Sequence, residues 1–337
     1  MGAESRWKRP TKSEAALRPS ENVVTIVLAA VLPIVVTFLL GFVASRRHDF
    51  QPKDAATLNR MVMLYAVPLA LFAGTVTTSR AALLEDTPLV VALGVAIVGF
   101  YVLVFLLARV VFHQQTSISA LAALTASAPA VPFVGPTVLG DLFGGISAIP
   151  IAVAGLIINL TVVPVTILLL ALDQGRLASA HAPHRSIIAA KVGETVKEPI
   201  VWAPVLAFVI VLGGVHIPRI AVNSLSLLGN ASGGVALFAS GIVLSASKLK
   251  LNRYVVVLVL LKNVVQPAAV FGGVLWLGYP GPIGSEAVLT TAIPALALVI
   301  ILALQYRVAQ AEAASAIFFS LIGSPITIGM FFALTRT

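Results

Sequence analysis

Cysteine is absent from this chain, and acidic residues are scarce. The 337 residues include no cysteine and only 13 aspartates and glutamates. Without cysteine there is no disulfide framework and no thiolate metal site. The long apolar runs contain no acid deep inside them, since Asp141, Glu286 and Glu312 lie at the ends of runs. A proton relay of buried carboxylates is therefore disfavoured, whereas sodium held by backbone carbonyl groups remains open.

Sequence motifs of enzymes are missing as well. An intramembrane protease would need paired aspartates, a His-Glu-x-x-His motif, or a serine with a suitably placed base, and no apolar run carries them. The five histidines fall in loops or at segment ends, without the spacing of a metal site. We therefore predict that the chain is not an enzyme and that it needs neither a metal nor a cofactor.

Long hydrophobic runs dominate the sequence instead. Hydrophobic residues make up 59% of the chain and charged residues 10%, with a mean hydropathy of +1.03. Residues 23–44 and 149–172 carry no charge, and each run is long enough to cross ~30 Å of hydrocarbon. The net charge of +9 is spread between the runs rather than along one face with aromatic residues, so no nucleic-acid partner is expected. The sequence predicts an all-α, multi-pass integral protein of the inner membrane, with the lipid bilayer as its surroundings.

Ten membrane-spanning helices account for the apolar runs. A polar stretch, residues 173–197, divides the spans five and five. It separates a first five-helix repeat (residues 22–172) from a second (residues 198–337), and a basic tail (residues 1–21) precedes both. The predicted spans are residues 23–44, 58–78, 88–108, 117–139, 148–172, 198–216, 221–245, 254–277, 286–305 and 313–334.

Basic residues are distributed unevenly between the loops. The loops that alternate with 173–197 on the same side hold most of the lysines and arginines, whereas the opposite loops hold only Arg80, Arg219 and Arg336. Because basic loops remain in the cytoplasm, we expect the loop 173–197 inside and both termini outside. The basic N-terminal tail argues the other way, but the sum over the loops outweighs it.

An internal repeat relates the two halves. The letters ALFAG at residues 70–74 recur as ALFASG at residues 236–241, and Pro129 is matched by Pro294, 165 positions later. Both prolines are followed by alanine in the middle of a span. Because each half has an odd number of spans, the second half must enter the membrane upside down, which is the signature of an inverted repeat.

The paired prolines predict that spans four and nine are broken crossover helices. Proline removes a backbone donor and clashes with the preceding turn. If both helices unwind near mid-membrane and cross, their half-helix N-termini direct partial positive charge at one point, which suits a carboxylate. The alternative is a pair of ordinary kinks satisfied by the hydroxyl groups of Thr125, Ser127 and Thr291. The predicted substrate-binding residues are Ser127, Pro129, Ala130, Pro132, Gly135, Lys262, Thr291 and Pro294.

Two further polar residues lie within predicted spans. A charge at the bilayer centre is costly, so Lys262 should face protein or water. It either attracts an anionic substrate or extends toward the membrane interface, near the basic residues at 248–253. Asn159 offers a polar contact or an interhelical hydrogen bond.

Several motifs resemble the auxin efflux carrier family, and in particular its bacterial malonate-transporter-like members. They are Pro-x-x-Leu-Phe at 68–72, Phe-x-Gly at 133–135, Leu-Phe-x-x-Gly at 237–241, and the stretch from Ala292-Ile293-Pro294 to Ser315. The resemblance covers residues 22–337. It implies a scaffold of spans one, two, six and seven that forms a homodimer, with the remaining spans as a transport domain.

The resemblance also implies the function. We expect a secondary transporter of a small organic anion, such as a mono- or dicarboxylate, that works by efflux or is driven by the membrane potential. Many family members carry an asparagine in the span-four crossover where this chain has Ala130, so the substrate is left open. The alternative is a carrier like the bile-acid/sodium symporters, which would take up carboxylates with a cation but would want buried acids for sodium. A receptor or scaffold would not need two symmetric breaks.

Overall fold

The computed structural model describes residues 23–77, 87–143, 147–178, 193, 197–215, 217–246, 249–278 and 281–335. The predicted basic tail and most of the loop 173–197 lie outside these residues. Apart from one isolated bridge, all regular structure in the described part of the chain is helical. The prediction of an all-α protein is confirmed.

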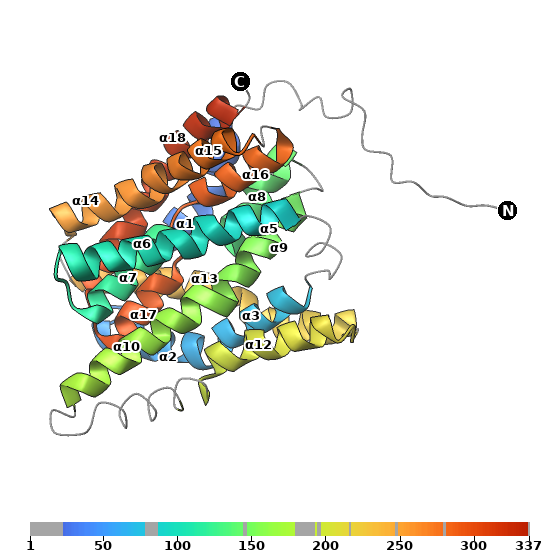
Figure 1. The fold of residues 1–337 in the computed structure, drawn as a ribbon. Helices are drawn as coiled ribbons and strands as arrows, with labels where there is room; N and C mark the ends of the chain where they lie inside the picture. Colours follow the sequence, from blue (N-terminus) through green and yellow to red (C-terminus); the bar gives the residue numbers. More distant parts are fainter. Residues whose placement is uncertain are drawn as a thin grey trace.

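The helices follow the hydrophobic runs closely. In chain order they are α1 (Val23–Arg46), α2 (Pro52–Met61), α3 (Val67–Val76), α5 (Thr87–Gly94), α6 (Phe100–Leu106), α7 (Thr116–Ser127), α8 (Val131–Phe143), α9 (Ala148–Ile157), α10 (Val163–Ala178), α12 (Pro199–Leu212), α13 (Arg219–Ala246), α14 (Arg253–Leu260), α15 (Gln266–Trp276), α16 (Pro282–Ala292), α17 (Leu298–Tyr306) and α18 (Gln310–Thr335). Figure 1 shows them as a bundle in which α14 and α15 continue one another, as do α5 and α6, and α9 and α10.

Several of these helices join into rods of membrane-spanning length. By length and apolar composition, six continuous helices among the described residues are able to cross a membrane. They are Pro52–Val76, Pro88–Val111, Ile149–Gly175, Arg219–Ser245, Arg253–Trp276 and Gln310–Thr335. Many of their large apolar side chains are exposed, such as Val95 at 68% and Ile326 at 77%, as expected for helices surrounded by acyl chains.

Short π-helical segments join the pieces of these rods. They are η1 (Val62–Ala66), η2 (Val95–Gly99), η5 (Ile158–Val162) and η6 (Leu261–Val265), while a fifth segment, η3 (Leu107–Val111), ends the rod that begins at Pro88. A π-helical turn displaces carbonyl groups from their usual partners and is often found at functional sites. Two of these segments, η5 and η6, carry the polar residues Asn159 and Lys262 that the sequence placed within spans.

Close packing between helices explains why three positions are occupied by glycine. A Cβ atom on Gly241 of α13 would lie 2.1 Å from the carbonyl oxygen of Phe38 in α1, and one on Gly41 would lie 2.0 Å from that of Phe238. The backbones of α1 and α13 therefore touch, as small residues allow in membrane bundles. Helix α13 also approaches α3, where a Cβ on Gly229 would lie 2.9 Å from the amide nitrogen of Ala70.

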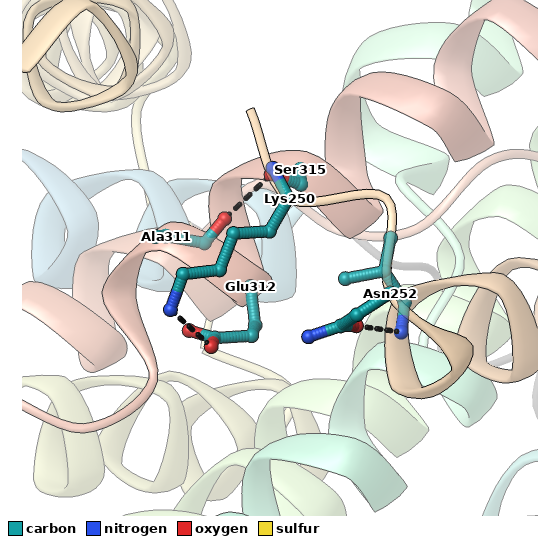
Figure 2. A network of polar contacts seen from close by, with 6 residues as sticks. Lys250, Asn252, Ala311, Glu312 and Ser315 are labelled. Atoms are coloured by element: carbon teal, nitrogen blue, oxygen red, sulfur yellow. Dashed lines mark hydrogen bonds and ion pairs between the residues drawn. The ribbon is translucent and has the colours of Figure 1, made fainter. Parts of the chain in front are cut away.

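A polar network fixes the connection from α13 to α14 against the start of α18 (Figure 2). The ammonium group of Lys250 lies 2.7 Å from a carboxylate oxygen of Glu312, and its backbone amide donates to the Ser315 hydroxyl at 3.1 Å. Asn252 caps α14 by accepting a hydrogen bond from the amide of Val255 at 2.9 Å. These contacts hold the end of one membrane helix to the beginning of another that is far away in sequence.

Candidate functional site

The two proline-containing breaks meet in the middle of the bundle. Helix α7 ends at Ser127 and α8 begins at Val131, while α16 ends at Ala292 and α17 begins at Leu298. Between them, Pro129 and Ala295 form an antiparallel bridge. The amide of Ala130 donates to the carbonyl of Pro294 at 2.8 Å, and the amide of Leu296 donates to that of Ala128 at 3.0 Å. Each break therefore satisfies backbone groups that the other leaves free.

The sequence explains why the chain is extended at these points. A residue that precedes proline is driven out of the helical conformation. Ala128, before Pro129, has φ −96° and ψ 109°, and Ile293, before Pro294, has φ −56° and ψ 138°. The hydroxyl groups of Thr125 and Thr291 bond carbonyls within their own helices. The alternative of two ordinary kinks is wrong, because the backbone leaves the helix at both points and the two breaks pair with each other.

A buried lysine and glutamine bind the carbonyl ends of the two broken helices. Lys262 is 0% exposed, and its ammonium group donates to the carbonyl of Thr291 at 2.9 Å and to the side-chain oxygen of Gln266 at 2.7 Å. Gln266 in turn donates to the carbonyls of Ser127 at 2.8 Å and of Ala96, in η2, at 3.1 Å. Because a helix carries partial negative charge at its C-terminus, the lysine stabilises the end of α16, while Gln266 satisfies the end of α7. The interpretation in which Lys262 extends toward the membrane interface is wrong.

A second chain of hydrogen bonds reaches the crossing from α18. Asn263, next to Lys262, donates to the backbone carbonyl of Ser320 at 2.7 Å and accepts from its hydroxyl at 2.6 Å. The same hydroxyl accepts a hydrogen bond from the amide of Ala295 at 3.1 Å. The segment η6 thus holds the crossing at two points, one through Lys262 and one through Ser320.

A cavity of about 830 Å³ lies beside the crossing, between α3 and α13 on one side and α8, α9, η5 and α17 on the other. Its polar lining residues are Thr75, Thr77, Ser147, Asn159, Ser226, Asn230 and Ser232. The first residues of α17, Ala297 and Leu298, also line it. No charged side chain lines this cavity in the described part of the chain.

The predicted site residues form the crossing and its support rather than the cavity wall. None of the eight is among the residues that line the cavity. The hydroxyl of Ser127 is buried without a hydrogen-bond partner in the described chain. Gly135 packs against Ile151, since a Cβ there would lie 3.1 Å from its side chain. Pro132 lies in the first turn of α8, and its side chain is outside the described part. Their role in binding remains a prediction.

Three buried polar side chains of the cavity have no partner. Thr75 is 2% exposed, Asn159 is 8% and Ser232 is 3% exposed. The Thr75 hydroxyl is fully buried without a hydrogen-bond partner in the described chain. The side chains of Asn159 and Ser232 also make no hydrogen bond to a described residue. Buried polar groups are normally hydrogen-bonded, so an unpaired set around a cavity points to a ligand or water. The interhelical hydrogen bond considered for Asn159 is not formed with any residue that the structure describes.

Sequence reasoning missed Thr75 and Ser232. A signal for Thr75 was present, because it directly follows the repeated ALFAG letters at 70–74. For Ser232, the signal was a run of small and polar residues on a membrane helix, at 229–234. Neither pattern shows which face of a helix meets a cavity, which depends on how α3 and α13 pack together.

Comparisons with known proteins match nearly the whole chain. A family model described as "Membrane transport protein" matches residues 26–332. The uncharacterized transporter YfdV of Escherichia coli strain K12 is 30% identical over 318 residues, which covers 93% of this chain and 98% of that protein. The YfdV proteins of Escherichia coli O157:H7 and Shigella flexneri match with the same identity and coverage.

Proposed function

The chain belongs to the membrane transport protein family of auxin efflux carrier-like transporters, and from this premise we propose that it carries a small organic anion, a mono- or dicarboxylate, across the inner membrane. Multi-pass proteins of this family are transporters rather than enzymes. The observation that supports the anion most directly is the antiparallel bridge between Pro129 and Ala295, with the N-terminus of α17 facing the cavity. A helix N-terminus favours negative charge.

For the architecture we propose ten spans in two inverted five-helix halves, residues 22–172 and 198–337. Two pairs of features at matching positions support this arrangement. The broken helices place Pro129 and Pro294 at equivalent points, and the π segments η2 and η6 begin at Val95 and Leu261, 166 positions apart. A homodimer formed through the scaffold spans is a further proposal, and it rests on the family resemblance.

The cavity would open to the outside in this topology. Its walls come from residues 67–77, 147–159 and 226–236, which lie in the outer half of the membrane if both termini are outside. On the opposite side of the crossing, Asn59 of α2 donates to the carbonyl of Ile301 in α17 at 3.2 Å. The path toward the cytoplasm would then be closed by packing of α2 and α13 against α17.

The membrane potential is the proposed driving force. An anion that leaves a negative-inside cell gains ~2.3 kcal/mol per charge at 100 mV, so export needs no coupling ion. The competing proposal is cation-coupled uptake, as in a carrier like the bile-acid/sodium symporters. It is disfavoured because the carbonyls of Thr291 and Ser127, which sodium would use at the crossing, already accept hydrogen bonds from Lys262 and Gln266.

Transport by purified protein in liposomes tests the proposal. Vesicles are loaded with labelled malonate, succinate or phenylacetate, and a potassium gradient with valinomycin sets the membrane potential. We expect release of at least one anion to speed up when the potential pulls negative charge outward, with no need for sodium. Electroneutral transport that depends strictly on a pH gradient, or a preference for cations, would contradict it.

A proline variant connects transport to the crossing. Pro294→Ala removes one break and should abolish transport while the protein stays folded. Pro88→Ala is the matched control, because Pro88 is exposed in the first turn of α5, where proline only starts a helix. Equal transport by both variants would argue against a crossing that takes part in transport.

A further inference from the structure

We infer that the cavity beside the crossing selects an anion of single charge, a monocarboxylate with an uncharged body, and that Thr75, Asn159 and Ser232 donate hydrogen bonds to it. The inference deepens the proposed function and rests on it. It concerns how many charges the substrate carries and which side chains touch it.

The first step is the balance of charge. All the residues that line the cavity are neutral in the described chain. Lys262, the one buried basic residue in the described chain, is not part of the lining, and its ammonium group is already bound to Thr291 and Gln266. Each charge that leaves water without a counter-charge carries a desolvation cost of its own. A dianion would therefore have to bury a second charge that no group of the cavity balances.

The second step is the number of helix termini. At the start of α17, the amides of Ala297 and Leu298 make no hydrogen bond within the described residues, and both residues line the cavity. Further along, the amides of Val299 and Ile300 are already taken by the carbonyls of Leu296 and Ala297. Two free amides at one helix N-terminus, with its partial positive charge of about half a unit, match one carboxylate.

The third step is the set of unpaired side chains. Thr75 and Ser232 come from α3 and α13, on one side of the cavity, and Asn159 comes from η5, on the other side. A threonine or serine hydroxyl and an asparagine amide are all able to donate to a carboxylate, to a neutral polar group, or to both. The Thr75 hydroxyl, 2% exposed and without a hydrogen-bond partner in the described chain, is the second, independent sign of a ligand that the helix terminus alone would not provide.

The rest of the lining describes the body of the substrate. Apolar side chains such as Leu71, Ile151, Leu156 and Ile301 make up much of the wall. The volume of about 830 Å³ lies in the range of pockets for small molecules and exceeds the needs of a three-carbon acid. An apolar chain or ring attached to the carboxylate would replace water on these walls.

Binding of matched ligands to the purified full-length protein tests the inference. The pair is 3-phenylpropionate and benzylmalonate, which share a body and differ by one carboxylate, and binding is measured by calorimetry in detergent. We expect 3-phenylpropionate to bind at least ~10-fold more tightly, and Thr75→Val to weaken it by ~10-fold, as for a lost hydrogen bond to a charged group. Ser224→Ala is the matched control, because that exposed hydroxyl bonds only Ile220 of its own helix.

A charge-switch variant provides a gain of function that misfolding cannot imitate. Asn159→Lys adds a cation to the cavity and should shift the preference toward benzylmalonate. Tighter binding of benzylmalonate than of 3-phenylpropionate to the unmodified protein would overturn the inference. So would the combination of an unchanged preference in Asn159→Lys and an unchanged affinity in Thr75→Val. Either result would leave the proposal of anion transport intact. If no organic anion is bound or transported, the proposed function fails, and the inference fails with it.

Discussion

Ser320 offers a sensitive test of how the crossing is held. Its hydroxyl accepts a hydrogen bond from the amide of Ala295 in the break and donates one to the side-chain oxygen of Asn263. The substitution Ser320→Ala removes both interactions without changing the helix, since alanine is the best helix former. It leaves the buried backbone amide of Ala295 and the buried side-chain oxygen of Asn263 without these partners.

The magnitude follows from these two groups. A buried polar group left unpaired costs ~1–3 kcal/mol in soluble proteins. Side-chain hydrogen bonds between membrane helices average only ~0.6 kcal/mol, because the unfolded state in the membrane also finds partners. For two groups we therefore expect a loss of roughly 1 to 6 kcal/mol in the free energy of unfolding.

Reversible unfolding in mixed micelles measures this loss. Ser324→Ala is the matched control, because Ser324 is equally buried, one turn further along α18, and bonds only the carbonyl of Leu321 in its own helix. Such back-bonding contributes little to stability, so no loss is expected there. If the two variants unfold with the same free energy, the crossing is not held by Ser320 and the reasoning is refuted.

Three further predictions concern packing, charge and topology. Gly241→Ala should destabilise the protein because the added Cβ meets the carbonyl oxygen of Phe38. Gly234→Ala, on the same helix, places its Cβ where nothing lies within 4 Å and should be tolerated. Thermal unfolding in detergent compares the two variants, and equal melting temperatures would contradict the close packing. Lys262→Met should lower the transport rate at least ~10-fold because the carbonyl end of α16 loses its donor, so full activity in liposomes would refute a role for the cation. A cysteine introduced at Ala180 should resist an impermeant thiol reagent added outside, and its labelling in intact cells would reverse the predicted orientation.

Most of the fold could be predicted from hydrophobic pattern and proline. The run at 254–277 was apolar enough to be recognised as a span, which the structure has as Arg253–Trp276, and Pro129 and Pro294 marked the breaks. These features are local, since proline acts on its own turn and on the residue before it. The pairing of Ala130 with Pro294 required only the further assumption that the two halves are related by symmetry.

The surroundings of individual side chains could not be predicted in the same way. Lys262 was expected either at a substrate or at the interface, but it binds the carbonyl of Thr291. That contact depends on the rotation of η6 about its axis, which is set by packing against α16 and α18. Likewise, Thr75 and Ser232 face one cavity because α3 and α13 approach closely at Gly229, a contact between residues far apart in sequence.

Substrate protection of a single cysteine at position 159 tests most directly whether an anion occupies the cavity beside the crossing. The natural chain has no cysteine, so Asn159→Cys introduces a unique thiol into the cavity wall, and Ser224→Cys introduces one at an exposed position of α13. The rate of reaction with a methanethiosulfonate reagent is measured with and without a saturating transported carboxylate. We predict that the carboxylate slows the reaction at position 159 and leaves position 224 unchanged. Equal rates with and without carboxylate at position 159 would contradict the account.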